Sequence, residues 1–297
     1  MKQCPLCGEE SFRSYYQGPI RSGVASQYTS EDHEVETCNE CGLVRLPDVG
    51  LTLEAYNSDV YRERFNGDTS LDAYLETHDA QESSRLSRMA ANDIRNKTLL
   101  DFGCGGGSFL DRTLGMTKES IGIDPNGRYV KALREREIIV FEDAESALRK
   151  YSSRIDTLTS FCVIEHTVDP LIYLKQAHDL LRPGGVMYLE TDNLNTLLMT
   201  MDYQPFEKFF FRTAHTYYFD QHTLAQLAKK AGFEAISISF RQVYDLSNLV
   251  LWLRDGNPTG NKQLKVFDNR LNSAYTDYLE ESGYADRIFL KMSKNSK

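Results

Sequence analysis

After Thr98, the pattern of hydrophobic residues alternates repeatedly between one typical of strands and one typical of helices. Apolar runs of four to six residues, which are typical of buried strands, alternate with segments in which apolar side chains recur at helical spacing. Repeated strand–helix units of this kind predict a mainly parallel sheet with helices on both faces. The first five predicted strands are residues 99–102, 121–124, 138–141, 157–162 and 186–190, and the helices between them are residues 109–114, 129–136, 144–150 and 170–181.

The pattern changes after the fifth strand. Residues 222–231 predict one more helix, and residues 233–240 and 248–253 predict two final strands. The connection between these two strands is too short for a helical crossover, so we expect them to pair antiparallel. The prediction is therefore an α/β fold with a Rossmann-like sheet of seven strands, of which the last is antiparallel.

The same patterns divide the chain into four segments. A cysteine-containing module is followed by a helical connector or lid, in which Tyr56, Tyr61, Phe65 and Tyr74 interrupt a charged stretch and a helix is expected from Gln81 to Ile94. The strand–helix core comes next, and a polar, helical extension ends the chain. The predicted boundaries are residues 1–47 for the module, 48–97 for the connector, 98–254 for the core and 255–297 for the extension.

Four of the six cysteines form two Cys-x-x-Cys-Gly pairs, with Cys4 and Cys7 in the first and Cys38 and Cys41 in the second. Two such turns can bring four thiolates to one cation, and the glycine allows the backbone to curl beneath it. We therefore predict a zinc ribbon, whose zinc is structural because four thiolates leave no open coordination position. The alternatives are two disulfides or a redox-active pair.

Composition and charge narrow the class of protein. The chain has 297 residues, 34 basic and 43 acidic side chains, a net charge of −9 and an isoelectric point near 5.3. This balance disfavours sequence-independent binding to nucleic acid, although it leaves room for a local basic patch. The sequence shows neither an apolar run of membrane-spanning length nor the apolar core of a secretory signal, so we expect a cytoplasmic protein without a membrane span.

The segment Asp101-Phe-Gly103-Cys104-Gly105-Gly-Gly lies where the first predicted strand turns into a helix. Glycines at such a turn let the backbone approach a ligand closely, and the amino end of the helix offers N–H groups to an anionic group. Asp124 ends the next strand, where a carboxylate can accept hydrogen bonds from both hydroxyls of a ribose. Ser108 replaces the last glycine of the dinucleotide motif, which disfavours a nicotinamide cofactor.

Six ordered features together resemble the class I methyltransferases that use S-adenosylmethionine. They are the acidic glycine turn, Asp124, Asp143-Ala144, Glu165-His166, the segment 181–185 before strand five, and the antiparallel last strand. The resemblance covers about residues 98–254 and implies an enzyme that transfers a methyl group. It also implies that Gly103, Cys104 and Gly105 hold the methionine part of the cofactor, that Asp101 orients its ammonium group, that Asp124 binds the ribose, that Asp143 and Ala144 bind the adenine, and that Glu165 lines the site.

The order of cysteine module, Tyr-rich connector and methyltransferase core also resembles methyltransferases that modify deoxysugar nucleotides. The segment His215-Thr-Tyr217-Tyr218-Phe is similar to a His-x-x-Tyr-Phe segment of that group. The resemblance implies that His215 is the base and that Tyr217 or Tyr218 orients the sugar. His166 is a second candidate base. Both histidines have a structural alternative, in which His215 fixes a loop and His166 lines the cofactor site.

Residues 212–214 differ in sequence from the corresponding residues of the sugar C-methyltransferases, and the carboxyl-terminal extension is shorter than theirs. Methylation of an oxygen or nitrogen atom of the acceptor therefore stays open. The predicted function is methyl transfer to a small molecule, namely a nucleotide-linked sugar or a related secondary or cell-surface metabolite. The first alternative is an RNA methyltransferase whose zinc module binds RNA, and the second is a non-catalytic protein that binds S-adenosylmethionine. The aromatic run Phe206, Phe209, Phe210 and Phe211 is expected either to wall a substrate pocket or to pack in a core or lid.

Overall fold

The computed structural model describes residues 3–47, 58, 60, 63–64, 70–260 and 262–296. The chain divides into two compact units, each built from three separate stretches of sequence. The first unit comprises Met1–Gly50, Glu190–Ala225 and Ile238–Phe289, and the second comprises Leu51–Leu189, Gln226–Ser237 and Leu290–Lys297. Three aromatic residues of the predicted connector, Tyr56, Tyr61 and Phe65, lie outside the described residues.

A seven-stranded sheet has the order β10-β11-β8-β7-β4-β5-β6. Its pairs β4–β5, β4–β7 and β5–β6 are parallel, and the carboxyl-terminal strand is antiparallel, which confirms the predicted α/β fold class. The apolar runs of these strands are buried, as expected for a parallel sheet covered on both faces. The strands are β4 (Thr98–Phe102), β5 (Glu119–Ile123), β6 (Ile139–Phe141), β7 (Ile155–Phe161), β8 (Leu181–Asp192), β10 (Glu234–Arg241) and β11 (Arg287–Ser293).

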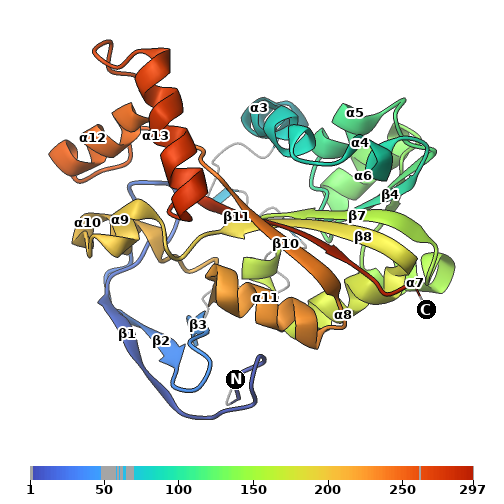
Figure 1. Cartoon of the computed structure of the whole chain (residues 1–297), viewed down its shortest axis with the longest axis horizontal. Helices are drawn as coiled ribbons and strands as arrows, with labels where there is room; N and C mark the ends of the chain where they lie inside the picture. The colour runs from blue at the N-terminus through green and yellow to red at the C-terminus, as the bar shows by residue number, and fades with distance from the viewer. Residues whose placement is uncertain are drawn as a thin grey trace. The chain divides into compact units, whose positions relative to one another are not determined.

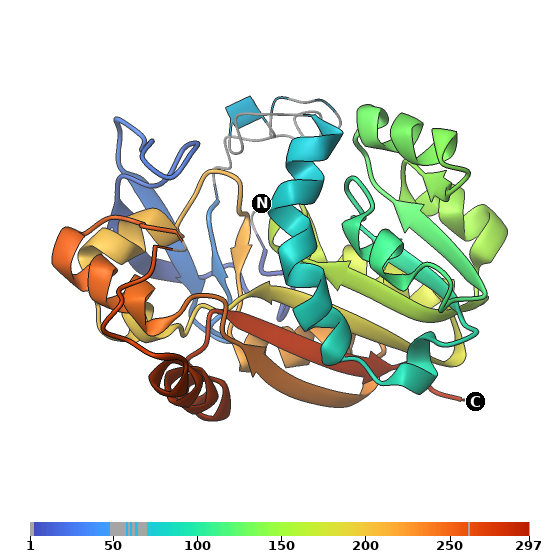
Figure 2. The ribbon, with the colours of Figure 1, turned by 90° about the horizontal axis from the view of Figure 1, so that it is seen from above.

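Helices cover both faces of the strands in the second unit. On one face lie α3 (Leu71–Ser87), α5 (Ser108–Thr113) and α6 (Gly127–Glu135), and on the other lie α7 (Ala144–Tyr151) and α8 (Pro170–Leu180) (Figure 1). Figure 2 shows α3 along its whole length, with α5 beside it. The helix predicted from Gln81 to Ile94 differs from the structure, because α3 begins earlier, ends at Ser87 and is followed by the short α4 (Ala91–Ile94).

The strand predicted over residues 248–253 is wrong. These residues belong to α12 (Leu246–Asp255), which Asp245 caps by accepting a hydrogen bond from the backbone N–H of Asn248, 3.1 Å away. An apolar run of this length fits a buried helix as well as a strand, so local pattern alone did not distinguish them. The helix ends at Gly256, whose φ of 66° lies in the left-handed region that favours glycine.

The last strand of the sheet is instead β11, which lies in the segment predicted as a helical extension. That segment contains the expected helix, α13 (Asn269–Ser282), but its final residues form a strand. Within β11 the three consecutive residues Ile288, Phe289 and Leu290 are buried. The sheet therefore draws its carboxyl-terminal strand from beyond residue 254, where the predicted core ended.

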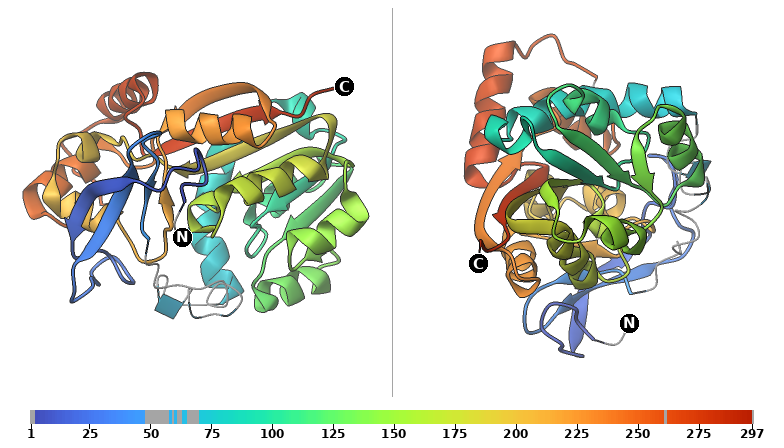
Figure 3. Two further views of the ribbon diagram at one scale, coloured as in Figure 1. Left: turned by 90° about the horizontal axis from the view of Figure 1, so that it is seen from below. Right: turned by 90° about the vertical axis from the view of Figure 1, so that its right-hand side faces the viewer.

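The cysteine module belongs to a second, four-stranded sheet of order β1-β2-β3-β9. Its strands β1 (Phe12–Gly18), β2 (His33–Cys38) and β3 (Val44–Arg45) are antiparallel neighbours, and Figure 3 shows β1 and β2 as a blue ribbon. The fourth strand, β9 (Tyr217–Tyr218), comes from far along the sequence and pairs antiparallel with β3. The amino-terminal module and the segment after His215 are thus parts of one sheet.

One hydrophobic cluster holds this first unit together. It combines residues of the module, such as Val35 and Val44, with Phe210, Phe211 and Tyr218. The neighbouring helices are α9 (Leu197–Thr200) and α10 (Gln204–Phe210), and α11 (Gln221–Lys230) follows β9. Among the described helices, none is both long and apolar enough to cross a lipid bilayer.

Candidate functional site

The backbone of the glycine turn after β4 has a conformation that is strained for residues other than glycine. Gly103, Gly105 and Gly107 have φ angles of 87°, 51° and 90°. The backbone N–H groups of Gly103 and Cys104 both donate to the carbonyl oxygen of Ile123, at 2.7 and 3.0 Å. A Cβ atom at Gly103 would collide with the side chain of Val163. The geometry of the turn therefore favours glycine at these three positions.

Tyr74 of α3 lies against this turn. Any Cβ added at Gly105 or Gly106 would collide with its ring. The ring is itself stacked on His78, with centroids 3.9 Å apart and planes inclined by 13°. The segment predicted to cover the core thus places an aromatic side chain directly on the glycine turn.

Asp124, at the end of β5, ties the turn to the neighbouring strand. It is buried, and its two carboxylate oxygens accept hydrogen bonds from the backbone N–H groups of Gly105 and Asn126, at 2.8 and 2.9 Å. These bonds hold the carboxylate at the position from which the sequence predicts contact with a ribose. The contact itself stays a prediction.

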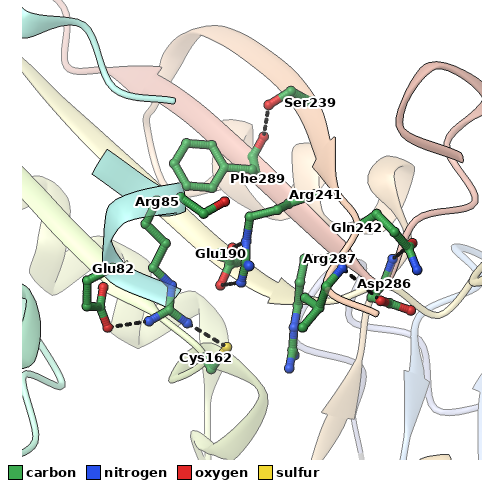
Figure 4. A network of polar contacts seen from close by, with 12 residues as sticks. Glu82, Arg85, Cys162, Glu190, Ser239, Arg241, Gln242, Asp286, Arg287 and Phe289 are labelled. Atoms are coloured by element: carbon green, nitrogen blue, oxygen red, sulfur yellow. Dashed lines mark hydrogen bonds and ion pairs between the residues drawn. The ribbon is translucent and has the colours of Figure 1, made fainter. Parts of the chain in front are cut away.

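Asp101 ends β4 as a deeply buried carboxyl group that accepts a hydrogen bond from the Thr159 hydroxyl, 2.7 Å away. Burial raises the pKa of Asp101 to about 7, and the charge of Glu82 adds to this effect, whereas the hydrogen bond from Thr159 and the charge of Arg85 oppose it. Arg85 donates to Glu82 at 2.7 Å and lies 3.6 Å from the sulfur of Cys162 (Figure 4). A cation beside Asp101 would favour its ionised form.

Because the folded chain holds the proton on Asp101 more tightly than the unfolded chain does, Asp101 lowers stability as the pH rises from about 4 to about 7. We therefore expect Asp101→Asn to gain stability over the parent protein, and to gain more at pH 8 than at pH 5. Urea unfolding of the ligand-free protein at both pH values measures this difference.

The Asp143→Asn variant provides a control without this pH dependence. Asp143 is exposed and caps α7, and the hydrogen bond from the backbone N–H of Ser146, at 2.7 Å, lowers its pKa. Because pH 5 and pH 8 both lie above the ordinary pKa of 3.8, the carboxylate is ionised in the folded and the unfolded chain at both, so its loss should cost the same stability at pH 8 as at pH 5. Equal pH dependence in the parent and the Asp101→Asn variant would contradict the raised pKa of Asp101.

The remaining predicted cofactor residues lie at the carboxyl ends of neighbouring strands. Ala144 is buried at the start of α7, after β6. Glu165 and His166 lie in a short 3₁₀ helix after β7, where Glu165 is buried and His166 is half-buried. The carboxyl ends of parallel strands form the usual ligand-binding edge of an open α/β sheet. The structure thus gathers these residues at the same edge as the glycine turn and Asp124.

Cys104 is part of the turn through its backbone. Its side chain is buried, and a Cβ atom at Gly122 would lie 2.6 Å from its sulfur. Burial raises the pKa of the Cys104 thiol well above its ordinary value, so the thiol is protonated at neutral pH. These properties agree with a packing role for the side chain.

The candidate base His215 belongs to the first unit, where its side chain is 3% exposed. Its Nδ1 atom lies 3.6 Å from a carboxylate oxygen of Asp192, at the end of β8. Asp192 also contacts the guanidinium groups of Arg212, at 2.5 Å, and Arg287. Sequence analysis missed Asp192, whose available signal was an acidic residue just after a buried strand.

Both candidate tyrosines are buried in the first unit. Tyr217 pairs with Arg45 in the four-stranded sheet. The hydroxyl of Tyr218 accepts a hydrogen bond from the backbone N–H of Arg212 at 2.9 Å and lies 3.2 Å from its carbonyl oxygen. Burial raises the pKa of Tyr218 above its ordinary value, so its hydroxyl stays neutral. Its observed role is to fix the backbone just before His215, and its predicted contact with a sugar stays a prediction.

The four cysteines of the amino-terminal module converge on one point. The sulfur of Cys4 lies 3.5 Å from that of Cys41, and the sulfur of Cys7 lies 3.4 Å from that of Cys38. All four sulfurs lie within 4.8 Å of one another. A tetrahedral zinc ion with zinc–sulfur bonds of about 2.3 Å needs sulfur atoms about 3.8 Å apart, so this donor set fits zinc.

Gly8 and Gly42 close the two cysteine turns. Their φ angles are 84° and 77°, and their N–H groups donate to the carbonyl oxygens of Cys4 and Cys38, at 2.8 and 3.0 Å. This left-handed conformation explains why each Cys-x-x-Cys pair is followed by glycine.

The fold resembles those of two solved methyltransferases. An S-adenosylmethionine-dependent methyltransferase from Thermotoga maritima, titled a possible histamine N-methyltransferase, has a TM-score of 0.51 and 18% identity over 74% of this chain and 91% of that chain. One from Archaeoglobus fulgidus has a TM-score of 0.52 and 17% identity over 79% of this chain and 98% of that chain. The fold is that of the class I methyltransferases that use S-adenosylmethionine.

Residues 74–238, more than half of the chain, match the family described as "Methyltransferase domain", and the chain belongs to that family. The ubiquinone biosynthesis O-methyltransferase of Ruegeria pomeroyi is 35% identical over 103 residues, which are 33% of this chain and 42% of that protein. The tRNA U34 carboxymethyltransferase of Pseudomonas paraeruginosa is 37% identical over 111 residues, 33% of each. The chain therefore spans less than half of the length of these relatives.

Family and fold support S-adenosylmethionine as the cofactor. The residues present fit this cofactor. Burial raises the pKa of the Asp101 carboxyl group, and the ammonium group of the methionine part would stabilise its ionised form. The predicted role of Asp101 toward that group thus has a physical reason in its burial.

Proposed function

We propose that this protein transfers a methyl group from S-adenosylmethionine to a small-molecule acceptor, namely a nucleotide-linked sugar, and that His215 removes the proton from the acceptor. The observation that carries the proposal is the pairing of β3 with β9, which joins the cysteine module to the strand that begins two residues after His215. The module therefore supports the candidate base. This role differs from that of a separate module that grips a macromolecule.

In this proposal each residue has a distinct task. When bound, S-adenosylmethionine supplies a methyl group already activated by a sulfonium. Asp101 would hold the ammonium group, Asp124 the ribose and Asp143 the adenine. His215 would take the proton from the acceptor hydroxyl or amine, and Asp192, 3.6 Å from Nδ1, would stabilise the imidazolium that forms. Such positioned proton transfer contributes about 10²–10⁴-fold in rate.

RNA is the rival acceptor, in view of the tRNA-modifying relative. The charges of the described part of the module count against it. Arg45 is paired with Glu36 at 3.1 Å, and Arg13 donates to Asn39. Residues 1–47 also carry more acidic than basic side chains. A surface of this kind is a poor match for a phosphate backbone, whose binding depends on Lys and Arg contacts.

The test is to incubate the zinc-loaded protein with methyl-labelled S-adenosylmethionine and a crude bacterial extract, and then to fractionate the label. We expect label in acid-soluble, nucleotide-linked material. Label in RNA would overturn the proposal in favour of the rival. Cofactor binding without any methylated product would overturn it in favour of a non-catalytic protein that binds S-adenosylmethionine.

The same assay tests the candidate base. We expect His215→Gln to lower turnover at least about tenfold, with cofactor affinity unchanged, because glutamine preserves a polar side chain but cannot accept the proton. His222→Gln is the matched control, since His222 is exposed on α11. Thermal melting verifies that both variants fold. Turnover of His215→Gln equal to that of the control would remove His215 from catalysis.

A further inference from the structure

The first unit contains a cavity that the cofactor residues do not use. Its volume is about 330 Å³, within the range of small-molecule sites. Every described residue that lines it belongs to the first unit, whereas the glycine turn and Asp124 belong to the second. The lining combines aromatic rings, including Phe206, Phe209 and Trp252, with three guanidinium groups. It is therefore a second place where a ligand can be held.

Three of the rings that line the cavity pack against one another and form its aromatic wall. Trp252 of α12 meets Phe206 and Phe209 of α10 edge to face, with centroids 5.2 and 5.1 Å from it. The guanidinium of Arg21 lies 4.4 Å from the centroid of Phe209. Phe206 and Phe209 belong to the aromatic run singled out in the sequence, and both are only partly buried. Phe211, by contrast, is buried in the hydrophobic cluster.

Among the described residues that line the cavity, cationic groups outnumber anionic ones. Arg21, Arg212 and Arg287 line it together with two carboxyl groups, Asp192 and Asp286. Arg212 and Arg287 share the single carboxylate of Asp192, so two cations face one anion there. Asp286 accepts hydrogen bonds from the backbone N–H groups of Val243 and Tyr244, at 3.0 and 3.1 Å, and Figure 4 shows it beside Gln242. The excess of cations favours an anionic ligand.

We propose that this cavity binds a nucleoside diphosphate, with its base against the wall of Phe206, Phe209 and Trp252 and its phosphates beside Arg212 and Arg287. Aromatic faces accept any nucleobase by stacking, and guanidinium groups match the geometry of phosphate oxygens. This inference rests on the proposed function, whose acceptor class it makes specific. It assigns the nucleotide end of the acceptor to a cavity built by the unit that also carries His215.

Calorimetric titration of the full chain with uridine 5′-diphosphate (UDP), uridine and inorganic pyrophosphate separates the two contributions. We expect UDP to bind at least about tenfold more tightly than either fragment, both alone and in the presence of saturating S-adenosylhomocysteine. Equal affinity for pyrophosphate would reduce the site to a general anion site and overturn the inference. Equal affinity for uridine, absence of UDP binding at millimolar concentration, or competition by S-adenosylhomocysteine would overturn it as well.

Variants of the cavity residues then test whether UDP binds in this cavity. Phe209→Leu and Arg212→Gln should each weaken UDP binding at least about tenfold, whereas Arg212→Lys should weaken it less because it keeps the charge. The matched controls are Tyr278→Leu and Arg270→Gln, at exposed positions of α13 outside the cavity, and thermal melting verifies folding. Cavity variants that bind UDP as the controls do would refute this location.

Failure of the UDP-binding inference can be distinguished from failure of the proposed function in the methylation assay. UDP binding that depends on the cavity, without methylated product, would retain the cavity and refute the proposed function. Methylation of sugar nucleotides that is unaffected by the cavity variants would do the reverse.

Discussion

Replacing Cys38 with serine is expected to abolish zinc binding and to unfold the four-stranded sheet of the first unit. Cys38 ends β2 as a buried residue, and its sulfur lies 3.4 Å from that of Cys7. Serine is a poor ligand for zinc, and the three remaining cysteines do not complete the tetrahedral site. In small zinc modules the metal contributes on the order of 10–16 kcal/mol to folding, so even part of this amount is a large loss.

Two measurements check this expectation. Elemental analysis should find one zinc ion per chain in the parent protein and none in Cys38→Ser, and thermal melting should show a lower midpoint. Cys162→Ser is the control, because Cys162 lies in the second unit, outside the four-cysteine cluster. A parent protein that lacks zinc and carries two disulfides, or a Cys38→Ser variant that retains full zinc content, would contradict the zinc ribbon.

The loss of zinc should also disturb the position of the candidate base His215. Because β3 pairs with β9, disorder in the module removes the partner of Tyr217 and Tyr218. The backbone hydrogen bonds that Tyr218 makes to Arg212, just before His215, depend on that strand. Turnover of Cys38→Ser should therefore fall together with zinc content. Chelation of the parent protein should reproduce this loss of turnover, and re-addition of zinc should reverse it.

Arg241→Met should destabilise the protein by about 3–5 kcal/mol. Arg241 and Glu190 form a bidentate pair, with distances of 2.5 and 2.9 Å, and their side chains are only 4% and 0% exposed (Figure 4). Removing the guanidinium leaves a carboxylate without its cation inside the protein. The desolvation cost of that charge, rather than the lost contact, sets the magnitude.

Urea unfolding measures the change in the free energy of unfolding. Two further variants show whether the buried charge is its cause. The double variant Glu190→Gln/Arg241→Met should recover part of the loss, because no charge is then left buried. Arg254→Met should have no measurable effect, since the Arg254–Asp255 pair is exposed to solvent. If Arg241→Met is as stable as Arg254→Met, the buried pair does not contribute as proposed.

The features that could be predicted from the sequence are those with local causes. The strand–helix alternation from Thr98 to residue 190 follows from side-chain periodicity, and the strands and helices lie within a few residues of their predicted positions. The glycine turn was recognisable because only glycine adopts those φ angles without strain. The two Cys-x-x-Cys-Gly pairs were recognisable for the same reason, together with the chemistry of thiolates.

The features that escaped prediction depend on partners distant in sequence. The apolar residues 248–253 form a helix and residues 287–293 a strand because of the neighbours that bury them, and local pattern is compatible with either structure in such short runs. Asp192 became a candidate only when β8, the segment before His215 and the start of β11 were brought together.

By itself, then, the sequence determined the strand–helix alternation of the core, the glycine turn and the two Cys-x-x-Cys-Gly turns, because local backbone and side-chain chemistry specify them; the class I methyltransferase fold came from the resemblance of these motifs to that family. Tertiary structure alone decided that β9 completes the sheet of the cysteine module, that β11 is the last strand, and that Arg212 and Arg287 share Asp192 beside an aromatic wall. Those arrangements join segments that are distant in sequence, such as β3 and β9, in which Arg45 pairs with Tyr217. They follow from burial and pairing of distant residues, which no local pattern encodes.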